Sequence, residues 1–130
     1  MDAVKVSSTD ARYTQTIHIR QFELVADEPV DVEGDDAGPN PTELLLGSLG
    51  ACKAITLKMY AGRKGWPLER VDVALTKGKV GDRPQIQAAL HLEGNLSEEQ
   101  KQRLLVIADK CPIHKMLSTS VDIHTALADA

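Results

Sequence analysis

Residues 38–60 read GPNPTELLLGSLGACKAITLKMY, and the fold depends on this stretch. Asn40 is a favourable N-cap, Pro41 suits the first helical position, and Glu43 lies three residues after the cap, as in a capping box. From Leu44 to Tyr60 the residues are apolar on most faces of a helix, which is typical of a helix buried on all sides. The stretch therefore predicts a long helix at the centre of the protein.

The remaining segments predict strands and a second helix around this one. Alternating polar and apolar residues predict strands at residues 13–19, 22–25, 71–75, 86–92 and 121–127. The acidic segment 31–40 contains two glycines and predicts a loop. Ser97 and Gln100 form a second capping-box pattern, and Pro112 breaks or restarts the helix that follows. This order predicts an α+β fold, with two helices packed on a mainly antiparallel sheet, in a single domain of residues 1–130.

The composition is that of a small globular domain with an aliphatic core. Of the 130 residues, 42% are hydrophobic and 26% are charged, which is ordinary for a soluble protein. At this length roughly two-thirds of the unfolded surface can be buried. The chain has one Trp, two Tyr and one Phe, so Leu, Ile, Val and Ala must supply the packing. A fold of this size often gains stability by forming a dimer.

Charge and cysteine usage exclude several classes of function. The net charge is −4 and the cations are scattered, which disfavours nucleic-acid binding because phosphate contacts need clustered cations. No run of 18 apolar residues predicts a membrane span, and the N-terminus lacks the apolar core of a signal peptide. We therefore expect a cytoplasmic protein, in which two cysteines are more often catalytic or redox-active than joined in a structural disulfide.

Cys52 lies in the middle of the long apolar helix, roughly 17 Å from its N-terminus at 1.5 Å per residue. The helix dipole acts only within the first turn and does not activate this thiol. Its helical neighbours include Leu49 and Ile55, and apolar surroundings raise a thiol pKa. Two interpretations stay open: a small core residue, or a reactive thiol that a cation or hydrogen-bond donor reaches from elsewhere in the fold.

Cys111 directly precedes Pro112, which disfavours a helical backbone at the cysteine. Cys111 is suited to be the N-cap of the short helix that Pro112 starts, where free N–H groups and the helix dipole favour a thiolate. Local chemistry therefore favours Cys111 over the first cysteine as the more acidic thiol. The alternative is a helix-ending cysteine packed on the helix before it, on the face shared by Leu104 and Ala108.

A metal site and two further polar residues complete the candidates. Cys111 and His114 are spaced as two ligands on one helical face, with Cys52 as a third, but no CxxC motif is present, so we expect no metal. Glu43 lies nine positions before Cys52, on the opposite side of a regular helix, so capping is its favoured role. Arg20 ends a predicted strand and would project into a cleft, although most such arginines are solvated.

Two motifs make the chain similar to a known family. The run from Gly38 to Cys52 resembles the first-cysteine helix of the OsmC/Ohr family, the osmotically inducible and organic hydroperoxide resistance proteins. The run Cys111-Pro112-Ile113-His114-Lys115-Met116-Leu117, together with Asp27-Glu28-Pro29, resembles one branch of OsmC-like proteins. The resemblance covers nearly the whole chain, with the motifs in the right order.

This resemblance implies an α+β fold that forms an intertwined homodimer, with two long helices buried at its centre and a site at each end of the interface. In catalytic members the first cysteine attacks a hydroperoxide and becomes a sulfenic acid, and the second condenses with it to a disulfide. By similarity Cys52 is the peroxidatic residue and Cys111 the resolving one. The implied partners are a small hydroperoxide and an external thiol reductant, with no bound cofactor.

One position departs from the family pattern. The well-studied peroxidases carry a Glu directly after Asn-Pro, paired to an Arg that holds the thiolate. Here that position is Thr42 and Glu43 follows it, which leaves Glu43 and Arg20 as candidates for the pair. We expect a thiol-dependent peroxidase acting on hydroperoxides. The alternatives are an OsmC-like dimer that binds a small apolar ligand without catalysis, and a redox sensor.

Overall fold

The predicted long helix is α1, Pro41–Lys64, and it begins at the predicted capping box. The Asn40 N–H donates to Glu43 Oε1 at 2.8 Å, and the Glu43 N–H donates to Asn40 Oδ1 at 2.8 Å. The box thus satisfies amide groups that a helix end leaves without partners. Arg63 and Lys64 lie in the last turn, where cations favour the helix dipole. The predicted start of this helix is confirmed.

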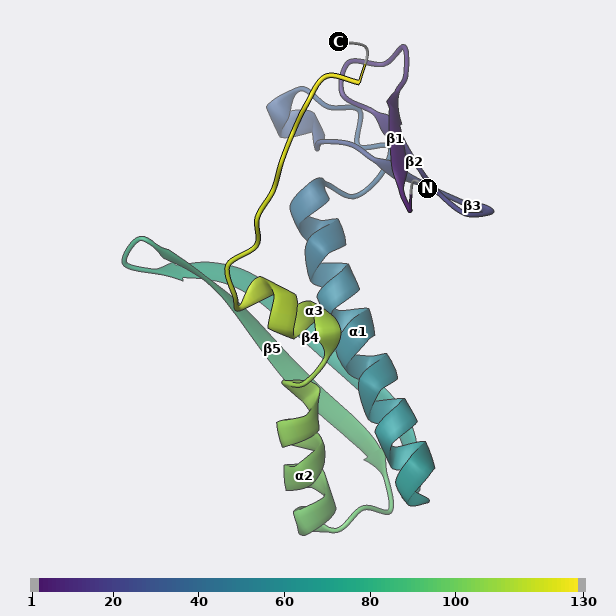
Figure 1. The fold of residues 1–130 in the computed structure, drawn as a ribbon, viewed down its shortest axis with the longest axis vertical. Helices are drawn as coiled ribbons and strands as arrows, with labels where there is room; N and C mark the ends of the chain where they lie inside the picture. Colours follow the sequence, from purple (N-terminus) through teal and green to yellow (C-terminus); the bar gives the residue numbers. More distant parts are fainter. Residues whose placement is uncertain (1–2, 129–130) are drawn as a thin grey trace. The chain divides into compact units, whose positions relative to one another are not determined.

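The computed structural model describes residues 3–128, which form two compact units divided between Gly47 and Ser48. The first unit contains β1, β2, β3, the 3-10 helix η1 and the first turns of α1. The second contains the rest of α1, then β4, β5, α2 and α3 (Figure 1). The bounds are β1 Lys5–Ser8, β2 Gln15–Ile19, β3 Phe22–Ala26, η1 Val30–Val32, β4 Leu68–Val80, β5 Arg83–Gly94, α2 Glu98–Ala108 and α3 Pro112–Leu117.

The first unit is a three-stranded antiparallel sheet in the order β1-β2-β3. The alternation that predicted β2 and β3 is confirmed, and Ile17 pairs with Leu24 across these strands. The loop after β3 is closed by the Asp27 N–H, which donates to Pro39 O at 3.1 Å. This bond brings the two ends of the loop together directly before α1.

The second unit is built on the antiparallel hairpin of β4 and β5, which is longer at both ends than predicted. Val80 pairs with Arg83, so the turn consists of Gly81 and Asp82. Gly81 has a φ of 61°, which suits glycine because a Cβ is disfavoured in the left-handed region. Alternate residues of the two strands, such as the paired Val71 and Leu92, are partly buried.

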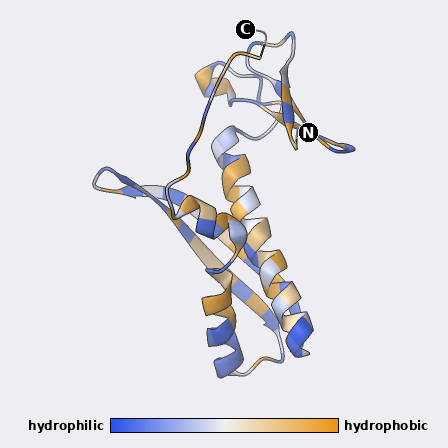
Figure 2. Cartoon of the chain, in the orientation of Figure 1, coloured by the Kyte–Doolittle hydropathy of each residue, from blue (hydrophilic) through white to orange (hydrophobic). Residues whose placement is uncertain are grey.

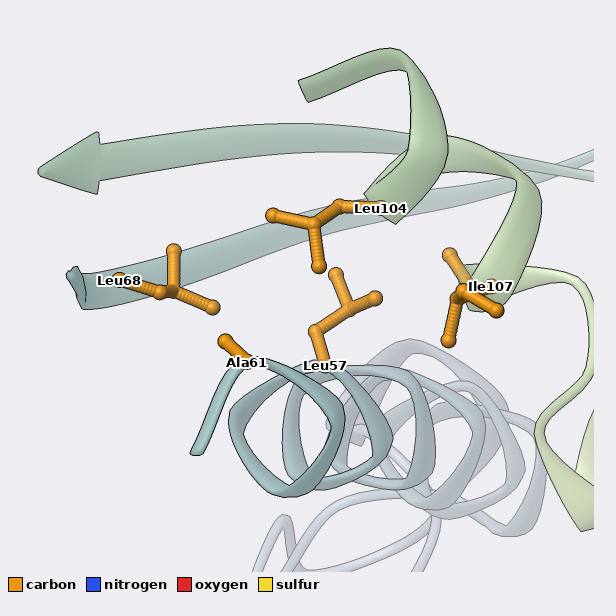
Figure 3. Packing of buried hydrophobic residues seen from close by; sticks show 6 residues of the cluster. Leu57, Ala61, Leu68, Leu104 and Ile107 are labelled. Carbon is orange, nitrogen blue, oxygen red and sulfur yellow. The ribbon is translucent and has the colours of Figure 1, made fainter. Parts of the chain in front are cut away.

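The core of the second unit joins both long helices to the hairpin. In Figure 3, Leu57 and Ala61 of α1 point toward Leu68 of β4 and toward Leu104 and Ile107 of α2. Leu57 and Leu104 are fully buried, and burying each such side chain stabilises the fold by about 1.5–3 kcal/mol. Helix α1 also approaches the hairpin closely at Gly50, where an added Cβ would lie 2.6 Å from Leu75 Cδ1.

The prediction that α1 is buried on all sides is not met within one chain. Its apolar residues continue through most of its length (Figure 2), yet Ile55 and Met59 are 55% and 59% exposed. By length and composition α1 could cross a membrane, with a mean hydropathy of 1.2 over its best window. A core helix has the same composition, and Leu49, Leu57 and Ala61 of α1 are buried. The absence of a membrane partner stays a prediction.

The predicted last strand is wrong for the described chain. Residues 121–127 form no strand, and Val121, Ile123 and Leu127 are exposed. A strand needs a partner for its backbone groups, and the alternation in the sequence does not say where that partner is. The order of the other elements and the α+β class agree with the prediction.

Candidate functional site

Cys52 lies on α1 about three turns from its start and is half-buried. Its immediate neighbour Lys53 is on the buried face of the helix, together with Leu49 and Leu57. The close approach at Gly50 fixes this part of α1 against β4. Cys52 therefore stands on a rigid helix at the border between the core and the surface.

Cys111 is fully buried and is the N-cap of α3, as the sequence predicted. Its backbone is extended, with φ −67° and ψ 145°, because Pro112 follows it. The His114 N–H donates to Cys111 Sγ at 3.3 Å. The helix α2 ends before this residue, at Ala108, so Cys111 begins one helix and does not close the other.

The structure brings the two cysteines together. Both are free thiols, and Cys52 is close enough to influence the pKa of Cys111. Burial, first of all, raises the pKa of Cys111, and the nearby Cys52 side chain acts in the same direction. The His114 N–H and the Lys53 charge oppose this rise without cancelling it. The expectation that the helix N-terminus favours a Cys111 thiolate is therefore not met, because desolvation exceeds the effect of the helix N-terminus.

Lys53 is the residue of this site that sequence reasoning missed. It is only 3% exposed, and its Nζ donates to three acceptors: Ala108 O at 3.0 Å, Asp109 Oδ1 at 3.4 Å and His114 Nδ1 at 2.9 Å. Asp109 also forms an ion pair with Lys53. A signal was present, because Lys53 falls four residues after Leu49 and four before Leu57 on the buried stripe. A lysine on such a stripe requires buried partners.

The other predicted site residues lie in the first unit. Glu43 is engaged in the capping box, which confirms its favoured role. Arg20 is exposed in the turn between β2 and β3, with a φ of 54°, and its guanidinium lies 5.0 Å from the centre of the Phe22 ring. Their participation in the thiol chemistry stays a prediction.

His114, which the sequence offered as a metal ligand beside the cysteines, forms a hydrogen bond with Lys53 instead. The Nδ1 of His114 faces Lys53 Nζ at 2.9 Å, so this nitrogen is occupied by a cation. Among residues 3–128, no group of three His, Cys, Asp or Glu side chains is placed to hold a metal ion.

A surface hollow of about 410 Å³ lies at the C-terminal end of α1, away from the thiols. Its lining includes Tyr60, Trp66 and Arg103. Arg103 Nε donates to Tyr60 Oη at 3.1 Å, a hydrogen bond that lowers the pKa of Tyr60. None of the predicted site residues lines this hollow.

A family model described as OsmC-like protein matches residues 34–126, which is most of the chain. The chain belongs to the OsmC-like protein family. The matched range of this OsmC-like protein includes both cysteines and Lys53, and it does not reach Arg20. No curated protein matches the chain significantly in sequence.

Solved structures show the same fold at low sequence identity. A Psychrobacter arcticus protein, described as an osmotic stress induced and detoxification response protein, has a TM-score of 0.77 and 22% identity, covering 89% of this chain and 88% of that chain. An OsmC-like protein of Mycoplasma pneumoniae has a TM-score of 0.74 and 20% identity, covering 88% and 84%. The organic hydroperoxide resistance protein OhrB of Bacillus subtilis has a TM-score of 0.61 and 20% identity, covering 92% and 91%. These similarities establish the OsmC-like fold.

Proposed function

We propose that this OsmC-like protein reduces hydroperoxides with its two thiols. The proposal rests on one observation: Lys53, the residue after half-buried Cys52, donates hydrogen bonds to Ala108 and His114 on either side of fully buried Cys111. Because Cys52 is the more exposed of the two cysteines, it would meet a peroxide first and Cys111 would follow. The resemblance of the fold to the Bacillus subtilis organic hydroperoxide resistance protein supports the same chemistry.

The reaction proceeds in three balanced steps. The Cys52 thiolate attacks one oxygen of the O–O bond, which breaks, and the leaving oxygen takes a proton and departs as an alcohol or water. Cys111 then attacks the sulfur of the Cys52 sulfenic acid, so that an S–S bond forms and water leaves. Two equivalents of an external thiol, in a reducing cytoplasm, return the disulfide to two thiols.

The preferred substrate is an organic hydroperoxide. Ile55 lies three residues after Cys52 and is more than half exposed, and Thr56, four residues after Cys52, carries a methyl group. An apolar approach to the sulfur favours a hydrocarbon tail over hydrogen peroxide, because burying the tail removes apolar surface from water.

The assembled form is a homodimer. Within one chain, apolar residues of α1 and of the C-terminal segment are exposed, and residues 121–127 have the alternation of a strand without pairing in one. A second copy would cover apolar surface of this kind. The proposal includes a supporting role for Arg20 and Glu43 at the Cys52 thiolate of the dimer.

The test is stopped-flow oxidation with cumene hydroperoxide. We expect the wild-type thiols to be consumed in a rapid phase that is lost in Cys52→Ser. In Cys111→Ser the first phase should remain, and a dimedone adduct on Cys52 should accumulate because no second thiol resolves it. If Cys52→Ser reacts as fast as the wild type, the assigned role is wrong.

The same experiment addresses a second function. Thr42 stands where the well-studied peroxidases carry Glu, which favours an OsmC-like dimer that binds an apolar ligand or senses oxidants slowly. Oxidation of wild-type Cys52 no faster than that of a free thiol, with no turnover by added thiols, would favour this second function.

A further inference from the structure

Lys53 joins the two segments that carry the thiols. It directly follows Cys52 in the sequence, and its acceptors lie on both sides of Cys111. Ala108 and Asp109 precede Cys111 by three and two residues, and His114 follows it by three. A single ammonium group therefore holds the end of α2 and the start of α3, with Cys111 between the two points of attachment.

The hydrogen bonds of this ammonium are fully used. An ammonium has three N–H donors and no acceptor, and the three acceptors take all of them. Since an ammonium can only donate, His114 Nδ1 is the acceptor in this contact. Ala108 O is the last carbonyl of α2, where a cation also favours the helix dipole. The three hydrogen bonds therefore fix the direction from which Lys53 holds the ends of α2 and α3.

This placement matters because disulfide geometry is narrow. In disulfides the Cα atoms are usually about 4.4–6.8 Å apart, and the two Cα–Cβ bonds must not point away from each other. The Cys111 turn is short. Apart from its contacts with Lys53, its described side-chain interactions are the bond from His114 N–H to Cys111 Sγ and the approach of His114 Nδ1 to Asp109 Oδ1 at 3.7 Å, both within the turn itself. Loss of Lys53 would thus release the turn on both sides of the sulfur.

We infer that Lys53 is the positioning residue for the resolving step: it holds the 108–114 turn so that Cys111 faces Cys52. The inference rests on the proposed function for its biological meaning. The positioning itself is a property of the thiol pair and is measurable without any peroxide.

The measurement is the equilibrium of the full chain with glutathione. Oxidised glutathione takes two electrons from the two thiols, so that the Cys52–Cys111 bond forms and two reduced glutathiones are released. The chain has only two cysteines, so non-reducing mass spectrometry of the monomeric chain reports this pair alone. We expect Lys53→Met to lower the equilibrium constant for disulfide formation by about tenfold to a hundredfold, because a disulfide with deviating geometry stores strain and is more easily reduced.

Lys58→Met is the matched control. Lys58 is also on α1, and its Nζ also donates to backbone carbonyls, those of Leu68 and Glu69, but it does not touch the Cys111 turn. This variant should stay within about twofold of the wild type, since its contacts and those of the thiols are independent. Thermal melting and circular dichroism of all variants confirm that the fold is retained.

A second pair of variants covers the case in which Lys53→Met does not fold. His114→Ala removes one acceptor of Lys53, whereas His114→Asn places an amide oxygen close to the position of Nδ1. We expect a loss of about threefold to tenfold for His114→Ala and near recovery for His114→Asn, in keeping with the coupling energies of contacting residues. A purely structural role of His114 would not distinguish these variants at equal stability.

The outcomes separate the two proposals. If Lys53→Met folds and has the wild-type equilibrium constant, the positioning role is overturned. If Lys53→Met does not fold, a wild-type equilibrium constant for both His114 variants overturns it. A wild-type chain that forms no intrachain disulfide in glutathione overturns it as well. If glutathione oxidises the pair as expected but cumene hydroperoxide does not oxidise Cys52, the proposed function fails and the positioning role stands.

Discussion

Asp27 and Lys53 are the two buried charged residues of the described chain, one in each unit, and they are satisfied in different ways. Asp27 accepts from Thr14 Oγ1 at 2.8 Å and from the backbone N–H groups of Glu28 and Ala37 at 2.7 and 3.2 Å. These donors come from its own loop and from the residue before the neighbouring strand. Lys53 reaches acceptors 55–61 residues away.

The distance of the hydrogen-bond partners along the chain shows what each buried charge holds: Asp27 anchors a loop, and Lys53 anchors the candidate site. Asp27 closes a local loop, and the same bond pattern would serve in any protein with such a loop. Lys53 connects segments that only the tertiary fold brings together, and those segments carry the thiols. A buried charge with distant partners is therefore the stronger pointer to a functional site, since burying it is costly and local structure does not require it.

The largest effect should come from the apolar residue next to Lys53 on the buried stripe. Leu57→Ala empties a fully buried position in the core of the second unit. We expect the free energy of unfolding to fall by about 2–5 kcal/mol, measured by urea denaturation followed through Trp66 fluorescence. A loss below about 1 kcal/mol would show that the core does not depend on this contact.

Asp27→Asn should act on the loop and leave the thiols unchanged. Burial by itself would raise the pKa of Asp27, but hydrogen bonds from Glu28, Thr14 and Ala37 outweigh it and hold the pKa below its usual value. Because the pKa is lower in the folded state, this stabilisation is present above the unfolded pKa of about 3.9 and is lost as the pH falls below it.

The measurement for Asp27 is amide hydrogen exchange of Glu28 and Ala37. At neutral pH we expect exchange to be faster in Asp27→Asn by on the order of tenfold, and the difference from the wild type should shrink in acid. The glutathione equilibrium of the thiols should not change. A shift of that equilibrium would break the distinction between the two anchors.

The smallest effect concerns Cys111 at alkaline pH. Burial raises its pKa in the folded state, so the unfolded chain releases the proton first as the pH rises. The folded state is therefore favoured below the unfolded thiol pKa of about 8.5, and its advantage declines above that pH. Cys111→Ala should have a melting temperature that falls less between pH 8 and pH 10. Equal slopes for the two proteins would contradict the shift.

Local signals explain which parts of the fold were predictable from the sequence. The capping boxes at Asn40 and Ser97 predicted both long helices, since a cap is decided within four residues. The hairpin was predictable for the same reason, because its alternation and its glycine turn are contiguous. The strand at 121–127 failed, because pairing depends on a partner that no local pattern identifies.

In the candidate site, too, the local features could be predicted from the sequence and the long-range contacts could not. Pro112 predicted the N-cap geometry of Cys111, which is local. Its pKa direction could not be predicted, because the burial that raises it comes from the packing of separate segments. Lys53 was visible as a charge on an apolar stripe, but its partners are 55–61 residues away in the chain.

The disulfide proposed between Cys52 and Cys111 has a consequence for the unfolded chain. A bond between these sulfurs would close a loop of about 60 residues, and in the chain-entropy account this restricts the unfolded ensemble by about 4 kcal/mol at 25 °C. Oxidation would thus make the protein harder to unfold at the moment when its thiols are spent. Until a thiol reduces it, the disulfide form would therefore unfold less often and would resist proteolysis better than the reduced form.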